Sequence, residues 1–133
     1  MNRNEFGLVK NFTSAAAIKP NRVLVFAAAE GQVQQASSPT AKRLIGCSGV
    51  IGTTAAGQRI DVYLGDVQPL EAGAAFDQGV ELTVDAEGRV IAANPAATVT
   101  QRIIGASLGV STALGEIVPV HIVPGTLSNA ANA

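Results

Sequence analysis

The chain is poor in the residues that build metal sites, disulfides and sugar-binding platforms. Its 133 residues include one cysteine, one histidine and no tryptophan, and aromatic residues make up only 4%. A single cysteine cannot form an intramolecular disulfide, and one cysteine with one histidine falls short of the ligand set of a zinc site. Few aromatic side chains also disfavour carbohydrate binding. We therefore expect no metal and no cofactor.

Charge and long hydrophobic runs are scarce as well. Charged residues make up 14%, and nine Lys and Arg against ten Asp and Glu leave a net charge of -1, without the basic patch that nucleic acid requires. Mean hydropathy is +0.30, yet no segment approaches the roughly 18 apolar residues of a membrane-spanning helix. Residues 1–5 lead into no apolar segment, so we expect no secretory signal and synthesis in the cytoplasm. Neither nucleic acid nor a membrane is an expected partner.

Two short blocks of the sequence each occur twice. Arg43–Ser48 (RLIGCS) reappears as Arg102–Ser107 (RIIGAS), and Glu30–Val33 (EGQV) reappears as Glu87–Val90 (EGRV). Blocks in the same order at nearly the same separation indicate an internal repeat. Two copies of about fifty residues are predicted, spanning 18–66 and 75–125.

Each copy has the pattern of β-strands. Apolar residues alternate with polar ones over residues 59–64, and the same alternation recurs over 117–122. Glu-Gly turns close a short hairpin in each copy, and helical periodicity is weak throughout. The sequence predicts an all-β fold, an antiparallel barrel or sandwich of two tandem repeats.

The ends differ from this body. Residues 1–13 lie outside the repeat and are predicted to form an extended arm with three apolar anchors, Phe6, Leu8 and Phe12. Residues 14–125 form one domain, and the small, polar residues 126–133 are expected to be a flexible tail.

Candidate catalytic residues all have a simpler structural explanation. His121 occupies an outward strand position with no recognisable nucleophile motif, and Cys47 takes a place where the other copy has Ala106, as a small buried thiol would. The glycine-rich run at 46–52 lacks the Gly-Lys-Ser/Thr ending of a phosphate loop. Scattered acids, as in the turn at 85–88, are expected to be solvated rather than to form a glycosidase or calcium site. We therefore expect no enzyme activity.

The two copies differ in one strand. With Val23–Val25 aligned on Val80–Leu82, Leu24 and Phe26 stand where the second copy has Glu81 and Thr83. The apolar face so created must be covered, either by the arm or by another subunit. Leu24 and Phe26 are therefore candidate interface residues, together with the three anchors of the arm.

With these features assembled, the chain resembles the capsid decoration (cement) proteins of bacteriophages. The resemblance runs from about Lys10 to Gly125 and rests on small residues and turns. Its main blocks are Asn11–Thr13, Leu44–Gly46, Leu70–Gly73, Asp85–Val90, Ile103–Ala106 and Val118–Val120.

The resemblance implies a structural virion protein on the outer capsid surface. Such a protein binds the major capsid protein, ties neighbouring subunits of the expanded shell together, and forms a homo-oligomer, commonly a trimer. By this likeness Phe6, Leu8 and Phe12 would anchor it. The leading alternative is a carbohydrate-binding or host-adhesion domain displayed on a virion, and a small β-barrel enzyme comes third.

Overall fold

The chain folds into β-strands throughout the part that the structure describes. The structure is a computed structural model, and it describes residues 8–128. No helix is present in this range, and hence none long and apolar enough to cross a membrane. The prediction of an all-β fold is confirmed. The ten strands are β1 (Val9–Ser14), β2 (Val23–Phe26), β3 (Gln32–Gln35), β4 (Gly46–Cys47), β5 (Arg59–Tyr63), β6 (Val67–Glu71), β7 (Glu81–Val84), β8 (Val90–Ala92), β9 (Thr100–Ser107) and β10 (Ile117–Ser128).

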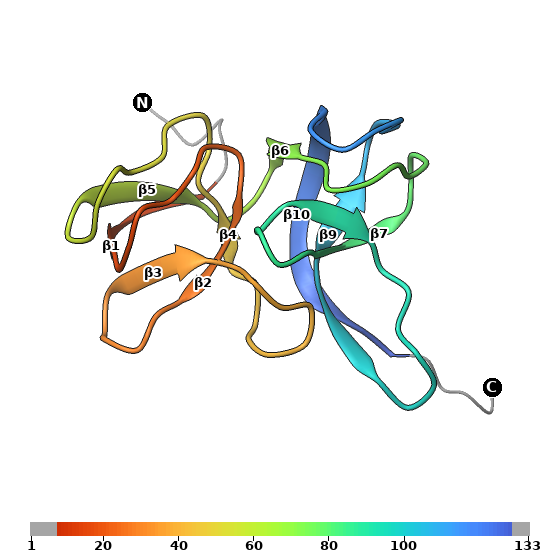
Figure 1. The fold of residues 1–133 in the computed structure, drawn as a ribbon, viewed down its shortest axis with the longest axis horizontal. Helices are drawn as coiled ribbons and strands as arrows, with labels where there is room; N and C mark the ends of the chain where they lie inside the picture. Colours follow the sequence, from red (N-terminus) through yellow and green to blue (C-terminus); the bar gives the residue numbers. More distant parts are fainter. Residues whose placement is uncertain (1–7, 129–133) are drawn as a thin grey trace.

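The strands form two sheets that lie side by side (Figure 1). The first is a closed barrel in the order β1-β3-β2-β4-β5, and the second is a five-stranded sheet in the order β6-β10-β9-β7-β8. When β6 to β10 are matched in turn with β1 to β5, corresponding strands have the same neighbours in both sheets, except that β6 and β8 do not form the ladder that β1 and β3 form. A parallel pair between β1 and β3 closes the barrel. The second sheet has a single parallel bridge at that place, between Ala72 and Val90, so its edges meet at one point only.

Isolated contacts outside the strands recur in the same way. An antiparallel bridge joins Ile18 to Thr53, and another joins Phe76 to Ser111, the same number of residues further along the chain. Positive backbone φ angles recur as well, at Asn21 (60°) and Gly79 (82°). The two sheets are thus built from one pattern of turns and pairings.

The pairing of β2 corrects the alignment made from sequence. In the barrel Leu24 faces Gly46, and in the second sheet Leu82 faces Gly105. Leu24 therefore corresponds to Leu82, one residue away from the alignment with Glu81. The hairpin loop of the first copy is one residue longer, since Phe26 pairs with Val33 but Val84 with Val90. Because successive strand residues point to opposite faces, this single residue exchanges the two faces.

Both faces of β2 are consequently buried. Leu24 points into the barrel, where it packs with Ile18, Val33, Ile45, Ile60 and Val62. Val23 and Val25 belong to a larger core that they share with the second sheet, whose contribution includes Leu70, Leu82, Val84, Ile104 and Val120. Burying each such side chain stabilises the fold by about 1.5–3 kcal/mol. This shared core joins barrel and sheet into one unit.

The glycine of each repeated Arg-Leu/Ile-Ile-Gly block allows two backbones to approach closely. A Cβ atom on Gly46 would lie 2.4 Å from the carbonyl oxygen of Tyr63, and one on Gly105 would lie 1.8 Å from that of His121. No real Cβ tolerates such a distance to backbone. The block is thus retained in both copies as a packing requirement.

The ends of the described chain are integrated more fully than the sequence suggests. Residues 9–13, assigned to the arm from sequence, lie in β1 and pair with β5 from Val9↔Tyr63 to Thr13↔Arg59. Residues 126–128, assigned to the flexible tail, pair in β10 with the start of β9. They form part of the ribbon that projects at the lower right of Figure 1. The pairing satisfies backbone groups that an unpaired arm would leave to water.

Candidate functional site

Cys47 and His121 are the residues considered from sequence for catalysis or metal binding, and the structure shows the surroundings of each. Cys47 is fully buried, and this burial raises the pKa of its thiol to about 12, so the thiol stays protonated and unreactive. His121 is exposed on β10, and its imidazole makes no hydrogen bond or ion pair with the residues that the structure describes. Within residues 8–128 there is no group of three or more His, Cys, Asp or Glu side chains that could hold a metal.

The acidic turn at residues 85–88 stabilises a hairpin. The Asp85 carboxylate accepts hydrogen bonds from the backbone N–H groups of Glu87 (2.8 Å) and Arg89 (3.0 Å), and its second oxygen contacts Arg89 Nε at 2.9 Å. Both carboxylate oxygens are therefore occupied within the turn, as in an Asx turn. Gly52, in the glycine-rich run, sits where a Cβ would be 2.0 Å from the carbonyl oxygen of Ile18, which explains its glycine.

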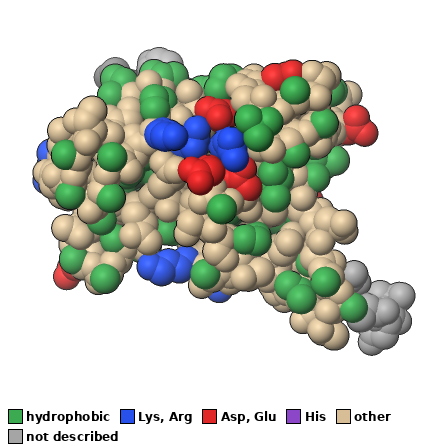
Figure 2. Space-filling model, in the orientation of Figure 1, with side chains coloured by type: hydrophobic (Ala, Val, Ile, Leu, Met, Phe, Trp, Pro, Cys, Tyr) green, Lys and Arg blue, Asp and Glu red, His purple; other side chains and the backbone are tan. Residues whose placement is uncertain are grey.

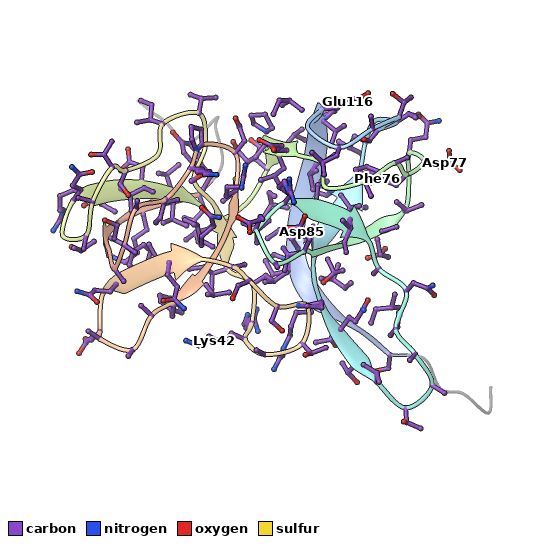
Figure 3. All side chains as sticks on the ribbon, viewed as in Figure 1. Lys42, Phe76, Asp77, Asp85 and Glu116 are labelled. Atoms are coloured by element: carbon purple, nitrogen blue, oxygen red, sulfur yellow. The ribbon has the colours of Figure 1, made fainter. Side chains whose placement is uncertain are left out.

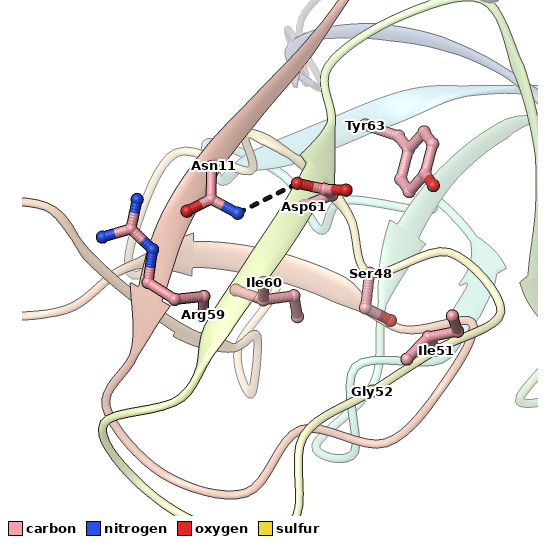
Figure 4. Close-up of a pocket in the computed structure, with 8 residues that line it drawn as sticks. All are labelled: Asn11, Ser48, Ile51, Gly52, Arg59, Ile60, Asp61 and Tyr63. Atoms are coloured by element: carbon pink, nitrogen blue, oxygen red, sulfur yellow. Dashed lines mark hydrogen bonds between the residues drawn. The ribbon is translucent and has the colours of Figure 1, made fainter.

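A hollowed surface follows the β1–β5 pair. One hollow of about 170 Å³ is lined by Asn11, Arg59, Asp61 and Tyr63 among others (Figure 4). In it the Asn11 side-chain amide donates to Asp61 Oδ1 at 3.0 Å. The polar groups in the hollow are thus an amide paired with a carboxylate, a guanidinium, a phenol and the hydroxyl of Ser48, which donates to the carbonyl oxygen of Lys19 at 2.9 Å. Nothing in this set forms the nucleophile and base pair that acyl transfer requires.

A second hollow of about 560 Å³ adjoins the first and shares Asn11 and Arg59 with it. Its apolar part is the edge-to-face pair of Phe12 and Phe26, whose ring centroids are 5.6 Å apart at an interplanar angle of 77°. The Nζ atom of Lys10 lies 5.7 Å from the centroid of the Phe12 ring. Phe26 is 48% exposed, an unusual position for a phenylalanine. We refer to this hollow as the aromatic groove.

The structure separates the five interface residues chosen from sequence. Phe12 and Phe26 come together in the aromatic groove, and Leu8 is 64% exposed immediately before β1. Leu24 is a correction: it is buried inside the barrel and has no surface to offer to a partner. The barrel itself covers Leu24, for the register reason given above. Phe6 lies outside the described residues.

A second exposed surface was missed from sequence. The outward positions of β6 and β10 and the loop between β9 and β10 carry exposed apolar side chains, and the loop also carries the carboxylate of Glu116. Val67, Leu108, Val110, Leu114, Ile117 and Val123 are each between 47% and 59% exposed. Alternating Ile, Pro, His and Val at residues 117–123 is the signal that could have revealed it. Exposed apolar area of this kind is typical of a contact surface.

Charged side chains gather where the barrel meets the second sheet (Figure 2). Arg22, immediately before β2, forms an ion pair with Glu71 of β6 at 3.1 Å and donates from Nη1 to the carbonyl oxygen of Glu87 at 2.9 Å. The Arg22 side chain is only 7% exposed. Gln35 Nε2 donates to the same carbonyl at 2.6 Å. These contacts fix the orientation of the two sheets, so the exposed surfaces sit on a rigid body.

Comparison with known proteins gives a structural neighbour. No protein-family model matches the chain, and no curated protein matches it either. The structure is similar to that of the N base of the head fibre gp8.5 of bacteriophage phi29, with a TM-score of 0.66 and 15% sequence identity. The match covers 92% of this chain and 98% of that chain. At this identity the likeness shows a shared fold.

Proposed function

We propose that this chain is a structural protein of a bacteriophage virion that binds the outer surface of the capsid. In this role it stabilises the expanded shell by bridging major capsid subunits, and it acts as a homo-oligomer, a trimer in the simplest case. The observation that carries the proposal is the fold shared with a phage head-fibre base over almost the whole of both chains. The resemblance to capsid decoration proteins, found independently in the sequence, points to the same place on the virion.

The surface chemistry supports a contact role over a catalytic one. The chain offers exposed apolar side chains on both sheets, held on a body whose halves share one core. A clamp needs such preorganised area, because each contact that is already rigid loses little entropy on binding. Several copies acting together convert weak single contacts into strong retention.

Binding to isolated heads tests the proposal directly. The purified chain is mixed with emptied, expanded heads of the phage that encodes it and with unexpanded heads, and both mixtures are sedimented. We expect saturable co-sedimentation with expanded heads, weaker binding to unexpanded heads, and a higher temperature of shell disruption when the chain is bound. No binding to either form would refute the proposal.

The aromatic groove favours one alternative, a carbohydrate-binding or host-adhesion domain displayed on the virion. An exposed aromatic ring flanked by the polar side chains of Asn11, Gln32 and Arg59 is a feature that sugar-binding sites also use. A glycan array separates the two functions. Specific glycan binding that is lost in Phe26→Ala, without binding to heads, would establish the alternative.

A further inference from the structure

The two halves of the molecule carry opposite net charge. Between residues 8 and 66 there are six Lys and Arg against three Asp and Glu, whereas between residues 67 and 128 there are two against six. The Arg22–Glu71 pair joins the halves and cancels one charge of each sign. The barrel therefore keeps a positive excess and the second sheet a negative one. The near-neutral total hides this separation.

The positive excess includes the surroundings of the aromatic groove. Lys10 and Arg59 line the groove with Glu30, and Lys42 Nζ donates to the backbone carbonyl oxygen of Phe26 at 3.1 Å. Among the described residues no carboxylate lies within ion-pair distance of any of these three cations. The groove thus combines an exposed aromatic ring with cations that have no acidic partner. It fits an apolar side chain with a carboxylate beside it.

The loop before β10 presents that combination. Leu114 is 59% exposed, and Glu116 follows two residues later. The carboxylate of Glu116 accepts hydrogen bonds from the backbone N–H of Thr112 at 3.0 Å and from the Thr112 hydroxyl. Gly115 N–H donates to the carbonyl oxygen of Ala72 at 2.8 Å. The loop is therefore held in one shape, with its leucine and its acid in fixed positions.

The corresponding loop of the barrel lacks both features. There Gln58 makes the equivalent contacts with Thr54, from Thr54 N–H to Gln58 Oε1 at 2.8 Å and from Gln58 Nε2 to the threonine hydroxyl at 3.1 Å. Its sequence has Ala56 where the second copy has Leu114. The same scaffold thus carries a neutral amide and a methyl group in one half, but an acid and a large apolar side chain in the other.

We propose that the aromatic groove of one copy binds the Thr112–Ile117 loop of a second copy. Glu116 lies at the upper edge of the second sheet, away from the barrel that carries the groove, and Lys42 lies at the lower side of the barrel (Figure 3). One chain therefore cannot fill its own groove. The contact is head-to-tail, and it forms the ring of a closed homo-oligomer when the rotation between successive copies closes. This inference rests on the homo-oligomer of the proposed function and identifies its interface.

Charge reversal with rescue tests the contact in the absence of capsids. Sedimentation equilibrium at low salt gives the dissociation constant of the wild-type chain. Lys10→Glu with Arg59→Glu is expected to weaken association about tenfold, and Glu116→Lys to weaken it by a similar factor. Combining all three changes restores attraction and returns the constant toward the wild-type value. Lys19→Glu with Arg43→Glu, which makes the same change in net charge at other exposed positions, is the matched control.

The outcomes separate the interface from the homo-oligomer. High salt weakens the wild-type association, because the groove and the loop are exposed and screened. A monomer at millimolar concentration overturns both the interface and the homo-oligomer. If the groove and loop variants associate as tightly as the wild type, the interface alone is overturned. The same holds if these variants are folded but the triple change does not restore their association. Circular dichroism and thermal melting establish that each variant is folded.

Discussion

Replacing Arg22 by alanine removes the contact that joins three segments across the boundary between the sheets. The guanidinium pairs with Glu71 at 3.1 Å and with the carbonyl oxygen of Glu87 at 2.9 Å. Losing one partner of a buried pair costs about 3–5 kcal/mol. Because the Glu71 side chain is 23% exposed, water recovers part of that cost. We therefore expect a loss of about 2–3 kcal/mol in the free energy of unfolding.

Urea denaturation followed by far-UV circular dichroism measures this loss. For a domain of this size, 2–3 kcal/mol corresponds to a fall of about 7–11 °C in the melting temperature. A single transition is expected for both proteins, because barrel and sheet share one core. Arg43→Ala is the control: Arg43 is exposed and in no ion pair with the described residues, so the change is expected to stay within about 0.5 kcal/mol. A loss below about 0.5 kcal/mol for Arg22→Ala would refute the reasoning.

Three further substitutions test the packing. Leu24→Ala, inside the barrel, is expected to cost about 2–5 kcal/mol in urea denaturation, and a near-neutral result would contradict the burial of Leu24. Gly46→Ala places a Cβ 2.4 Å from a backbone oxygen, so we expect poor soluble expression or a melting temperature at least 10 °C lower, by roughly 3 kcal/mol. Gly65→Ala, whose Cβ would meet nothing within 4 Å, is its control and would melt near the wild type. The Cys47 thiol has its pKa raised from 9.0 to about 12, so its protonated form stabilises the fold fully below pH 9, and that stability is lost as the pH rises toward 12. In Cys47→Ala the free energy of unfolding should not show this loss, which is about 1.4 kcal/mol per pH unit. Identical pH slopes of the free energy of unfolding for both proteins would be evidence against the burial of the thiol.

Sequence and structure agree where the argument rests on local periodicity. Alternating residues predicted the strands around 59–64 and 117–122, which are β5 and the first half of β10. These properties follow from short-range chemistry, which the sequence states directly.

The sequence went wrong where one residue decides a face. An alignment by similarity does not detect the extra residue in the first hairpin loop. The alignment therefore assigned Leu24 to an exposed face, whereas Leu24 is buried inside the barrel. The sequence also could not predict that residues 9–13 form a strand of the barrel, because their partner strand, β5, lies far along the chain.

The sequence by itself determined that the chain is all β, that its turns and glycines recur, and that it has few residues of the types that bind metals or form disulfides. Only the tertiary structure decided which faces are covered, that Phe12 meets Phe26, and that Arg22 joins the two sheets. It also showed that the loop carrying Glu116 lies away from the aromatic groove. The physical reason is that strand patterns are set by neighbours along the chain, whereas burial and charge complementarity depend on pairings between residues that the chain brings together only on folding.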